Sequence, residues 1–197
     1  AMLVGTVGYF IYWGLGYTHY NYAALFIIAT MFGVFMAFNI GGNDVANSFG
    51  TSVGAGTLTI PQALLIAAVF EVSGAVIAGG EVTNTIRKGI VDLKGVDFEP
   101  IQFVFIMMSA LLAAALWLLF ASKKGLPVST THSIIGGIVG SAVCMAVMND
   151  AASGDLIRWG KLGGIGVSWV LSPVLGGAVS YFLFSRVKKN VLDYNAW

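Results

Sequence analysis

Charged side chains are scarce in this chain. Of its 197 residues only 10% are Asp, Glu, Lys or Arg, whereas 57% are hydrophobic, and a soluble domain usually carries about 25% charged residues. The formal net charge is +1, and the basic residues are dispersed among loops and the tail. We therefore predict an integral membrane protein, and we exclude a soluble domain and a nucleic-acid partner.

Cysteine and a secretory leader are also lacking. Cys144 is the single cysteine, which excludes a disulfide framework within the chain. Its place in an apolar stretch favours a small packing residue. Residues 1–16 have neither a basic start nor a clear cleavage site, so no signal peptide is predicted.

Long apolar runs dominate the rest. Most of the six runs have the length of about 17–25 residues that a membrane helix needs, whereas a membrane barrel shows short alternating segments. The prediction is an all-α polytopic helix bundle with a broken helix, one transmembrane domain over residues 1–197, with a basic and cytoplasmic tail. Residues 126–147 either cross the membrane fully or form a re-entrant hairpin, which would change the orientation. Polar loops are expected at 81–100 and 149–160. The expected spans are 2–16, 23–38 plus a half-helix 44–53, 60–80, 101–121, 126–147 and 161–185.

The most unusual stretch, residues 41–54, is polar and lies between two apolar runs. The pair Gly41-Gly42 favours a helix break, after which Asn43 or Asp44 would cap a short half-helix. An acid at membrane depth costs roughly 2.5–3.5 kcal/mol, so Asp44 marks a candidate functional site. The polar groups share one helical face: Asn43, Asn47 and Thr51 recur at every fourth position, with Asp44 and Ser48 as a parallel pair.

A second acid, Glu71, falls inside the expected span 60–80, among small residues. Small residues around an acid indicate a face that packs on other helices. Glu71 therefore either shares a cation site or proton relay with Asp44, or stays protonated and bonds a neighbouring helix.

The second polar stretch, residues 125–133, follows a predicted helix end at Pro127. Ser129, Thr130 and Thr131 place three hydroxyls at a helix start, and free N–H groups there favour an anion. The alternative is that these residues only cap the helix. His132 is either an accessory ligand or a packing histidine. Downstream, Gly136-x-x-x-Gly140 predicts close helix contact.

Helix breaks that meet inside a membrane are typical of secondary transporters. Helix N-termini offer N–H donors to an anion, whereas carboxylate and amide oxygens suit Na⁺ or accept H⁺. Both kinds of group are present here, which predicts an anion moved together with cations. Tetrahedral phosphate fits, but the spacing alone does not separate phosphate from sulfate.

Four segments carry a family resemblance. GGNDVANSFGTSVG at 41–54 resembles the signature of the inorganic phosphate transporter (PiT) family, and FEVSGA at 70–75, VTNTIRKG at 82–89 and GLPVSTTHS at 125–133 also look like family segments. The similarity runs from about residue 25 to about residue 147, and more loosely beyond. The four motifs occur in the family's order, which makes the resemblance specific.

The resemblance implies a cell-membrane symporter of inorganic phosphate with Na⁺, or with H⁺ in some members, and no resident cofactor or catalytic residue. The implied phosphate-binding residues are Asn43, Asp44, Ser129, Thr130 and Thr131. The cation candidates are Asn43, Asp44, Asn47 and Glu71, since oxygen groups suit a hard ion. Ser48, Thr51 and His132 are accessory candidates.

The departure from the family is length. PiT transporters carry two inverted copies of this unit, and no second Gly-x-Asn-Asp occurs in residues 55–197. We expect either the N-terminal half of a transporter, favoured by Ala1 before Met2, or a half-size protein that pairs with another copy. In both cases a second half must cover the polar face, because exposed irregular backbone is not tolerated in lipid.

Other functions fit less well. The chain could serve another oxyanion such as sulfate, as a transporter or channel, or it could be a non-transporting membrane subunit. An intramembrane hydrolase using Ser129, His132 and Asp44 is disfavoured, because no Gly-x-Ser-x-Gly elbow is present. No enzymatic activity is predicted.

Overall fold

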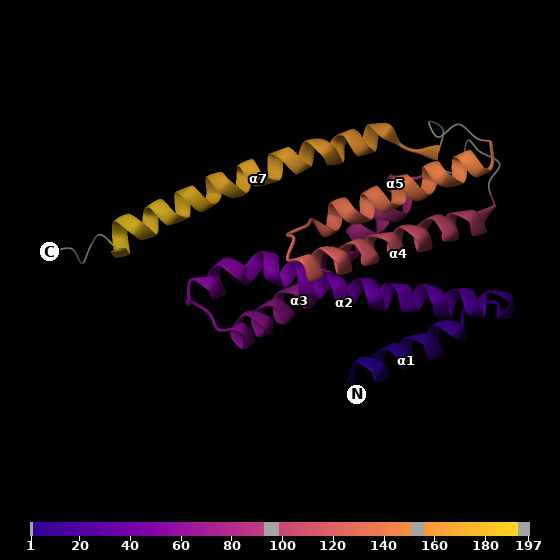
Figure 1. Ribbon diagram of the computed structural model, residues 1–197, viewed down its shortest axis with the longest axis horizontal. Coiled ribbons are helices and arrows are strands. Elements are labelled where there is room, and N and C mark those ends of the chain that lie inside the picture. Colours follow the sequence, from indigo (N-terminus) through magenta and orange to yellow (C-terminus); the bar gives the residue numbers. More distant parts are fainter. Residues whose placement is uncertain (1, 93–98, 151–155, 193–197) are drawn as a thin grey trace. The chain divides into compact units, whose positions relative to one another are not determined.

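The computed structural model describes residues 2–92, 99–150 and 156–192, and it is helical over most of that length (Figure 1). The chain divides into two units, residues 1–157 and 158–197. The first unit holds α1 (Met2–Leu15), the short 3₁₀ helix η1 (Tyr20–Tyr22), α2 (Ala23–Gly54), α3 (Ile60–Gly89), α4 (Pro100–Lys124) and α5 (Thr130–Met148).

Helix α2 is continuous over 32 residues, from Ala23 to Gly54. The predicted break at Gly41-Gly42 and the separate half-helix 44–53 are therefore wrong. Each glycine inside a helix costs about 1 kcal/mol relative to alanine, which is too little to interrupt a helix that packs along α4. At the helical rise α2 measures roughly 48 Å, well beyond the ~30 Å hydrocarbon core.

Helices α4 and α5 form a hairpin, and the sequence explains both ends of α4. Pro100 occupies its first turn, where a missing N–H is harmless. Gly125 ends it with φ of 67°, and its N–H bonds the Ser122 carbonyl at 3.1 Å. Pro127 then lies in the link to α5, as predicted.

The close contact between α4 and α5 involves a different glycine from the one expected. A Cβ on Gly137 would lie 2.8 Å from the Ala110 carbonyl oxygen, whereas Gly136 and Gly140 have open space around them. The predicted Gly136-x-x-x-Gly140 contact is therefore wrong within this chain. Gly137 allows the backbones of α4 and α5 to approach each other.

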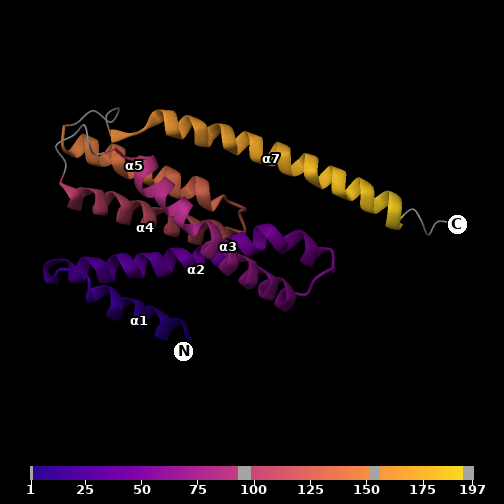
Figure 2. The same ribbon diagram turned by 180° about the vertical axis from the view of Figure 1, so that it is seen from behind.

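The core of this unit lies where α2 meets α4. Met36 packs with Ala114, Ala115 and Leu118, and Val128 packs against the same cluster. Tyr22 near the start of α2 and Ile101 near the start of α4 line one cavity, so the two helices run parallel. Figure 2, the view from behind, shows α2, α4 and α5 side by side as in Figure 1.

Helices α1 and α3 differ in length from their predicted spans. Helix α1 has only 14 residues, about 21 Å, which is short for a span. Helix α3 runs on to Gly89, so Glu81 is helical and not part of a loop; Asp97 and Lys94 lie outside the described residues. Among the residues that the structure describes, five helices are long and apolar enough to cross a membrane.

The second unit consists of α7 (Trp159–Val187) and the π-helical turn η2 (Lys188–Leu192). The predicted span 161–185 is thus helical throughout, with Pro173 inside the helix. Near its end, the Arg186 guanidinium lies 5.2 Å from the centre of the Phe182 ring. These helices make the chain an all-α, multi-pass membrane protein.

Candidate functional site

The polar face of α2 is built from asparagines one turn apart. Asn39 and Asn43 are only 4% and 5% exposed, and buried amides require hydrogen-bond partners. The Asn39 Nδ2 donates to the Phe35 carbonyl oxygen at 2.7 Å. The Asn43 Oδ1 accepts a bond of 3.0 Å from the Asn47 Nδ2. Within the described part of the chain, no buried side-chain nitrogen or oxygen lacks a partner.

Asn47 also ties α2 to the link between α4 and α5. Its Nδ2 donates to the Val128 carbonyl oxygen at 3.1 Å, across 81 positions of sequence. Asn47 lies seven residues before the end of α2, which is about 10 Å at the helical rise. The start of α5 is therefore held beside the predicted polar face, part-way along α2.

One contact joins the two polar stretches directly. The Thr130 Oγ1 donates a hydrogen bond of 2.7 Å to the Asp44 Oδ1, across 86 positions. A hydroxyl bonded to a carboxylate makes a short and strong hydrogen bond. Asp44 is half-buried, so this bond stabilises a charge that lipid would disfavour.

The first turn of α5 has a capped end with hydroxyls around it. The Ser129 Oγ accepts from the His132 backbone N–H at 3.3 Å and lies 2.5 Å from His132 Nδ1. Ser129 thus acts as the N-cap, as one of the predicted alternatives required. In the described structure the N–H groups of Thr130 and Thr131 have no backbone acceptor, as is usual in a first turn.

The structure does not bring every predicted residue to this junction. Glu71 lies on an exposed part of α3, and across the described ranges its carboxylate has no hydrogen bond or ion pair. In the described residues no direct bond joins Glu71 to Asp44, and a cation site shared by the two carboxylates stays a prediction. Ser48 and Thr51 are exposed on α2.

Sequence reasoning missed the carbonyl of Val128, because it considered side chains and not backbone acceptors. A signal existed: Pro127 prevents a helix here, so a carbonyl in this link has no regular helical donor. The structure brings Asn43, Asp44, Asn47, Ser129 and Thr130 together around this link. Their roles in binding stay predictions.

The junction is separate from an apolar cavity behind it. A cavity of about 260 Å³ lies between α2 and the start of α3, lined by Gly41, Ala46, Phe49 and Leu64 among others. Asp44 and Thr130 do not line it. The small residues of the polar stretch thus face α3, while its amides face α4 and α5.

Substituting Asn47 with alanine should destabilise the junction, because the variant loses the bonds to Asn43 and Val128. Each hydrogen bond contributes about 0.5–1.5 kcal/mol, so we expect a loss of about 1–3 kcal/mol of stability. Thermal unfolding in detergent measures it. Ser48→Ala, an exposed neighbour, is the matched control, and equal stability of the two variants would contradict the tie.

Three kinds of comparison place the chain among known proteins. Residues 40–196 match the model of the phosphate transporter family. A protein of Mycobacterium bovis named "Putative phosphate permease" is 59% identical over 197 residues, covering 98% of this chain and 36% of that protein. One of Haemophilus influenzae with the same name is 46% identical, covering 84% of this chain and 38% of that protein.

A solved structure agrees with these relatives. The chain matches a structure titled "The sodium-dependent phosphate transporter" with a TM-score of 0.75 and 44% identity, covering 85% of this chain and 40% of that one. The chain therefore spans only 36% to 40% of the length of the proteins it matches here.

Proposed function

The chain belongs to the phosphate transporter family, and from that membership we propose that it moves inorganic phosphate across the membrane with a coupled cation, Na⁺ in preference to H⁺. The observation that carries this proposal is the 2.7 Å bond between Thr130 and Asp44. It joins a hydroxyl-rich helix start, suited to an anion, to a carboxylate, suited to a cation. Phosphate and the cation are cargo, and we propose neither a resident cofactor nor a catalytic step.

The phosphate is proposed to bind at the start of α5. The hydroxyls of Ser129, Thr130 and Thr131 and the first N–H groups of the helix all donate hydrogen bonds, and the helix dipole adds positive potential there. Asn43 and Asp44 would border the anion from α2. Since phosphate carries negative charge, Asp44 must be neutralised when the two lie close together.

The cation is proposed to supply that neutralisation. The Asp44 carboxylate and the amide oxygens of Asn43 and Asn47 are oxygen ligands, which a hard ion such as Na⁺ prefers. The similar solved structure is that of a sodium-dependent phosphate transporter, which supports Na⁺. Glu71, on α3, is the second carboxylate proposed as a ligand of the cation.

A coupling mechanism follows from the single hydroxyl proton of Thr130. In the observed state that proton is donated to Asp44, so it is not available to phosphate. A cation bound to the carboxylate takes over its charge and releases the hydroxyl for the anion. Cation binding and phosphate binding would therefore strengthen each other, as linkage requires.

A partner is proposed because the polar face is incompletely covered. Ser48, Thr51 and Glu71 are exposed in this chain, and lipid would leave such groups unsatisfied. We propose that a second repeat half, or another copy of the chain, covers this face and completes the pathway. We propose that this assembly lies in the cell membrane, plasma or inner.

Substituting Glu71 with glutamine should change the Na⁺ or pH dependence of uptake if the carboxylate ionises during the cycle. Loss of one charged oxygen ligand is expected to raise the half-saturating Na⁺ concentration about tenfold, the equivalent of 1.4 kcal/mol. Glu81→Gln, an exposed acid on the same helix, is the control. Unchanged Na⁺ and pH profiles would assign Glu71 to helix packing instead.

The proposed function is tested by phosphate uptake into liposomes, with the chain alone and with a second half added. We expect uptake that requires Na⁺, that needs the second half and that excess sulfate or molybdate does not suppress. Equal suppression by sulfate would indicate a transporter of another oxyanion. Absence of any phosphate binding by the complete assembly would indicate a non-transporting subunit.

A further inference from the structure

Two apolar cavities lie end to end along the seam between α2 and α4. The first, about 390 Å³, is lined by residues near the start of both helices, including Tyr22 and Ile101. The second, about 490 Å³, is lined by α4 residues down to Leu111 and by residues of α3 and α5. Ala29 and Val104 line both cavities, so the two form one groove.

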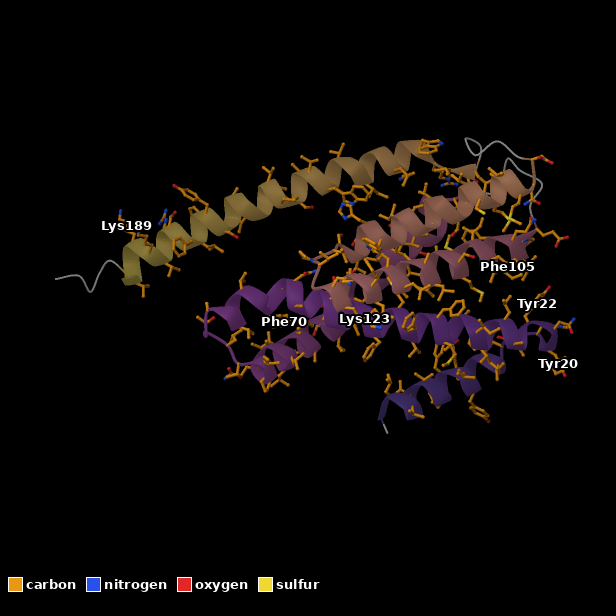
Figure 3. All side chains as sticks on the ribbon, viewed as in Figure 1. Tyr20, Tyr22, Phe70, Phe105, Lys123 and Lys189 are labelled. Carbon is orange, nitrogen blue, oxygen red and sulfur yellow. The ribbon has the colours of Figure 1, made fainter. Side chains whose placement is uncertain are left out.

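The mouth of the groove lies at an aromatic belt. Tyr17, Tyr20 and Tyr22 are exposed around the start of α2, and Figure 3 shows Tyr20 and Tyr22 at this end, with Lys123 well away from them along the helices. Tyrosine gathers at the headgroup level of membranes, and lysine marks the ends of spans. The groove therefore opens at one membrane interface and runs toward the bilayer centre.

The length of the groove matches one leaflet. Ile101 and Leu111 are ten residues apart on α4, which is about 15 Å at the helical rise, half of the ~30 Å hydrocarbon core. Apart from hydroxyls of Thr18 and Tyr22 at the mouth and Thr83 on α3, the lining is apolar. The hydroxyls of Thr18 and Thr83 are already bonded to backbone carbonyls.

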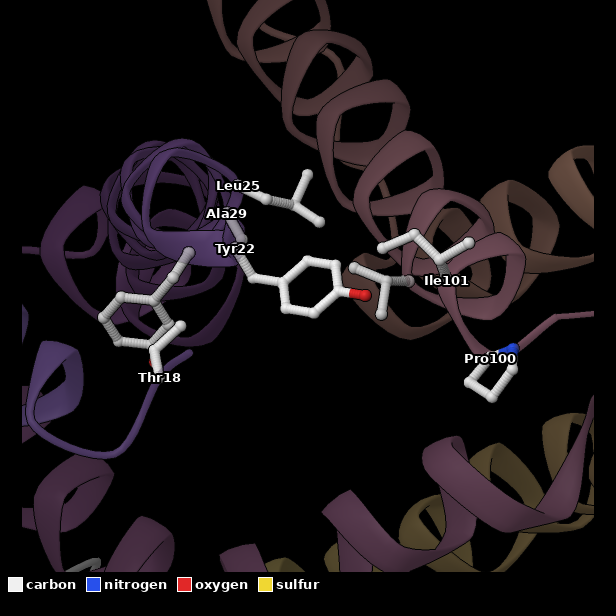
Figure 4. A pocket seen from close by; sticks show the side chains of 8 residues that line it. Thr18, Tyr22, Leu25, Ala29, Pro100 and Ile101 are labelled. Carbon is white, nitrogen blue, oxygen red and sulfur yellow. The ribbon is translucent and has the colours of Figure 1, made fainter. Parts of the chain in front are cut away.

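The close-up in Figure 4 shows how the mouth is shaped. The Tyr22 ring reaches from α2 toward Ile101 of α4, and its hydroxyl lies at the end of the ring that faces α4. A phenol placed there offers a donor to an ester or phosphate oxygen while its ring covers apolar surface. Deeper in, Met107 and Met108 line the wall, and methionine adapts to flexible apolar ligands.

We propose that this groove binds one acyl chain of a membrane phospholipid, with the headgroup at Tyr22 and the chain end near Leu111. A slender, flexible chain of one-leaflet length fits the groove, whereas water would find few polar partners in it. A transmembrane helix crosses both leaflets, whereas the groove has the length of about one leaflet. This site is independent of the transport proposal.

The test uses the chain in phosphatidylcholine vesicles that contain a phospholipid with a photoactivatable diazirine on one acyl chain. With the diazirine at the chain end, we expect crosslinks in residues 103–111. With the diazirine next to the ester, they should move to residues 18–25 and 100–101. Ile77, 83% exposed on α3, reports contact with bulk lipid.

A filling variant sharpens the result. Ala29→Phe places a ring where the two cavities join, and displacing about two methylene groups should reduce chain-end labelling of 103–111 about tenfold. Ala24→Phe, at an exposed position of α2 that lines neither cavity, should leave it unchanged. In the wild-type chain, the proposal would be overturned if the crosslinked residues were the same for both diazirine positions. It would also be overturned if groove residues were crosslinked only as much as Ile77. No labelling of the groove in a longer, complete assembly would assign it to protein instead.

Discussion

Asp44→Asn is expected to lower Na⁺-coupled phosphate uptake by about a hundredfold or more, while the protein still inserts in the membrane. The substitution keeps the shape of the side chain and an oxygen that accepts from Thr130, but it removes the charge. The proposed cation loses its charged ligand, and a hundredfold loss corresponds to about 2.8 kcal/mol, since each 1.4 kcal/mol is about tenfold. Uptake of labelled phosphate at fixed Na⁺ measures the loss.

A matched control separates the charge of Asp44 from general effects of removing an acid. Asp150 lies in an exposed turn after α5 with φ of 53°, a backbone conformation that asparagine also tolerates. Asp150→Asn should therefore leave uptake near the wild-type level. Full Na⁺-dependent uptake by Asp44→Asn would contradict the assignment of the cation to this carboxylate.

The double variant Thr130→Ala with Thr131→Ala should weaken phosphate binding far more than Na⁺ binding. A hydrogen bond to a charged group contributes about 1.5–3 kcal/mol, so losing both hydroxyls should raise the dissociation constant of phosphate at least about a hundredfold. The cation keeps its carboxylate and amide oxygens. Calorimetric titration with phosphate, and separately with Na⁺, distinguishes the two effects.

The control for this variant removes two hydroxyls elsewhere. Thr30 and Thr57 each donate to a backbone carbonyl, at 2.8 and 2.7 Å, and neither lies at the junction. Thr30→Ala with Thr57→Ala should leave phosphate affinity unchanged. If the Thr130 and Thr131 variant also bound phosphate normally, the start of α5 would not be the anion site.

Much of the candidate site could be predicted from the sequence because it depends on local spacing. Asn43 and Asn47 are one turn apart, so any helix over this stretch places them on one face, and the observed Asn47 to Asn43 bond confirms that placement. Pro127 lies in the link between α4 and α5, as expected, and Gly125 is the residue that caps the end of α4. In an otherwise apolar chain, polar side chains find hydrogen-bond partners mainly in one another.

The wrong prediction of a helix break gave the local preference of glycine more weight than helix packing. Gly41 and Gly42 lower helix stability, yet α2 continues through them, because a lipid-exposed break would leave backbone groups without partners. Glu71 shares a helical face with small residues, but the neighbouring sequence does not determine which helix packs on that face. In the described structure Glu71 is exposed on α3, so no helix of the described residues covers that face.

The measurement that tests the central claim most directly is a density map of the complete assembly in Na⁺ and phosphate. We predict tetrahedral density within hydrogen-bond distance of Thr130 and Thr131, a cation beside the Asp44 carboxylate, and the Thr130 hydroxyl turned from Asp44 to the anion. A map with both ions bound elsewhere, and with the 2.7 Å bond between Thr130 and Asp44 intact beside lipid, would contradict it.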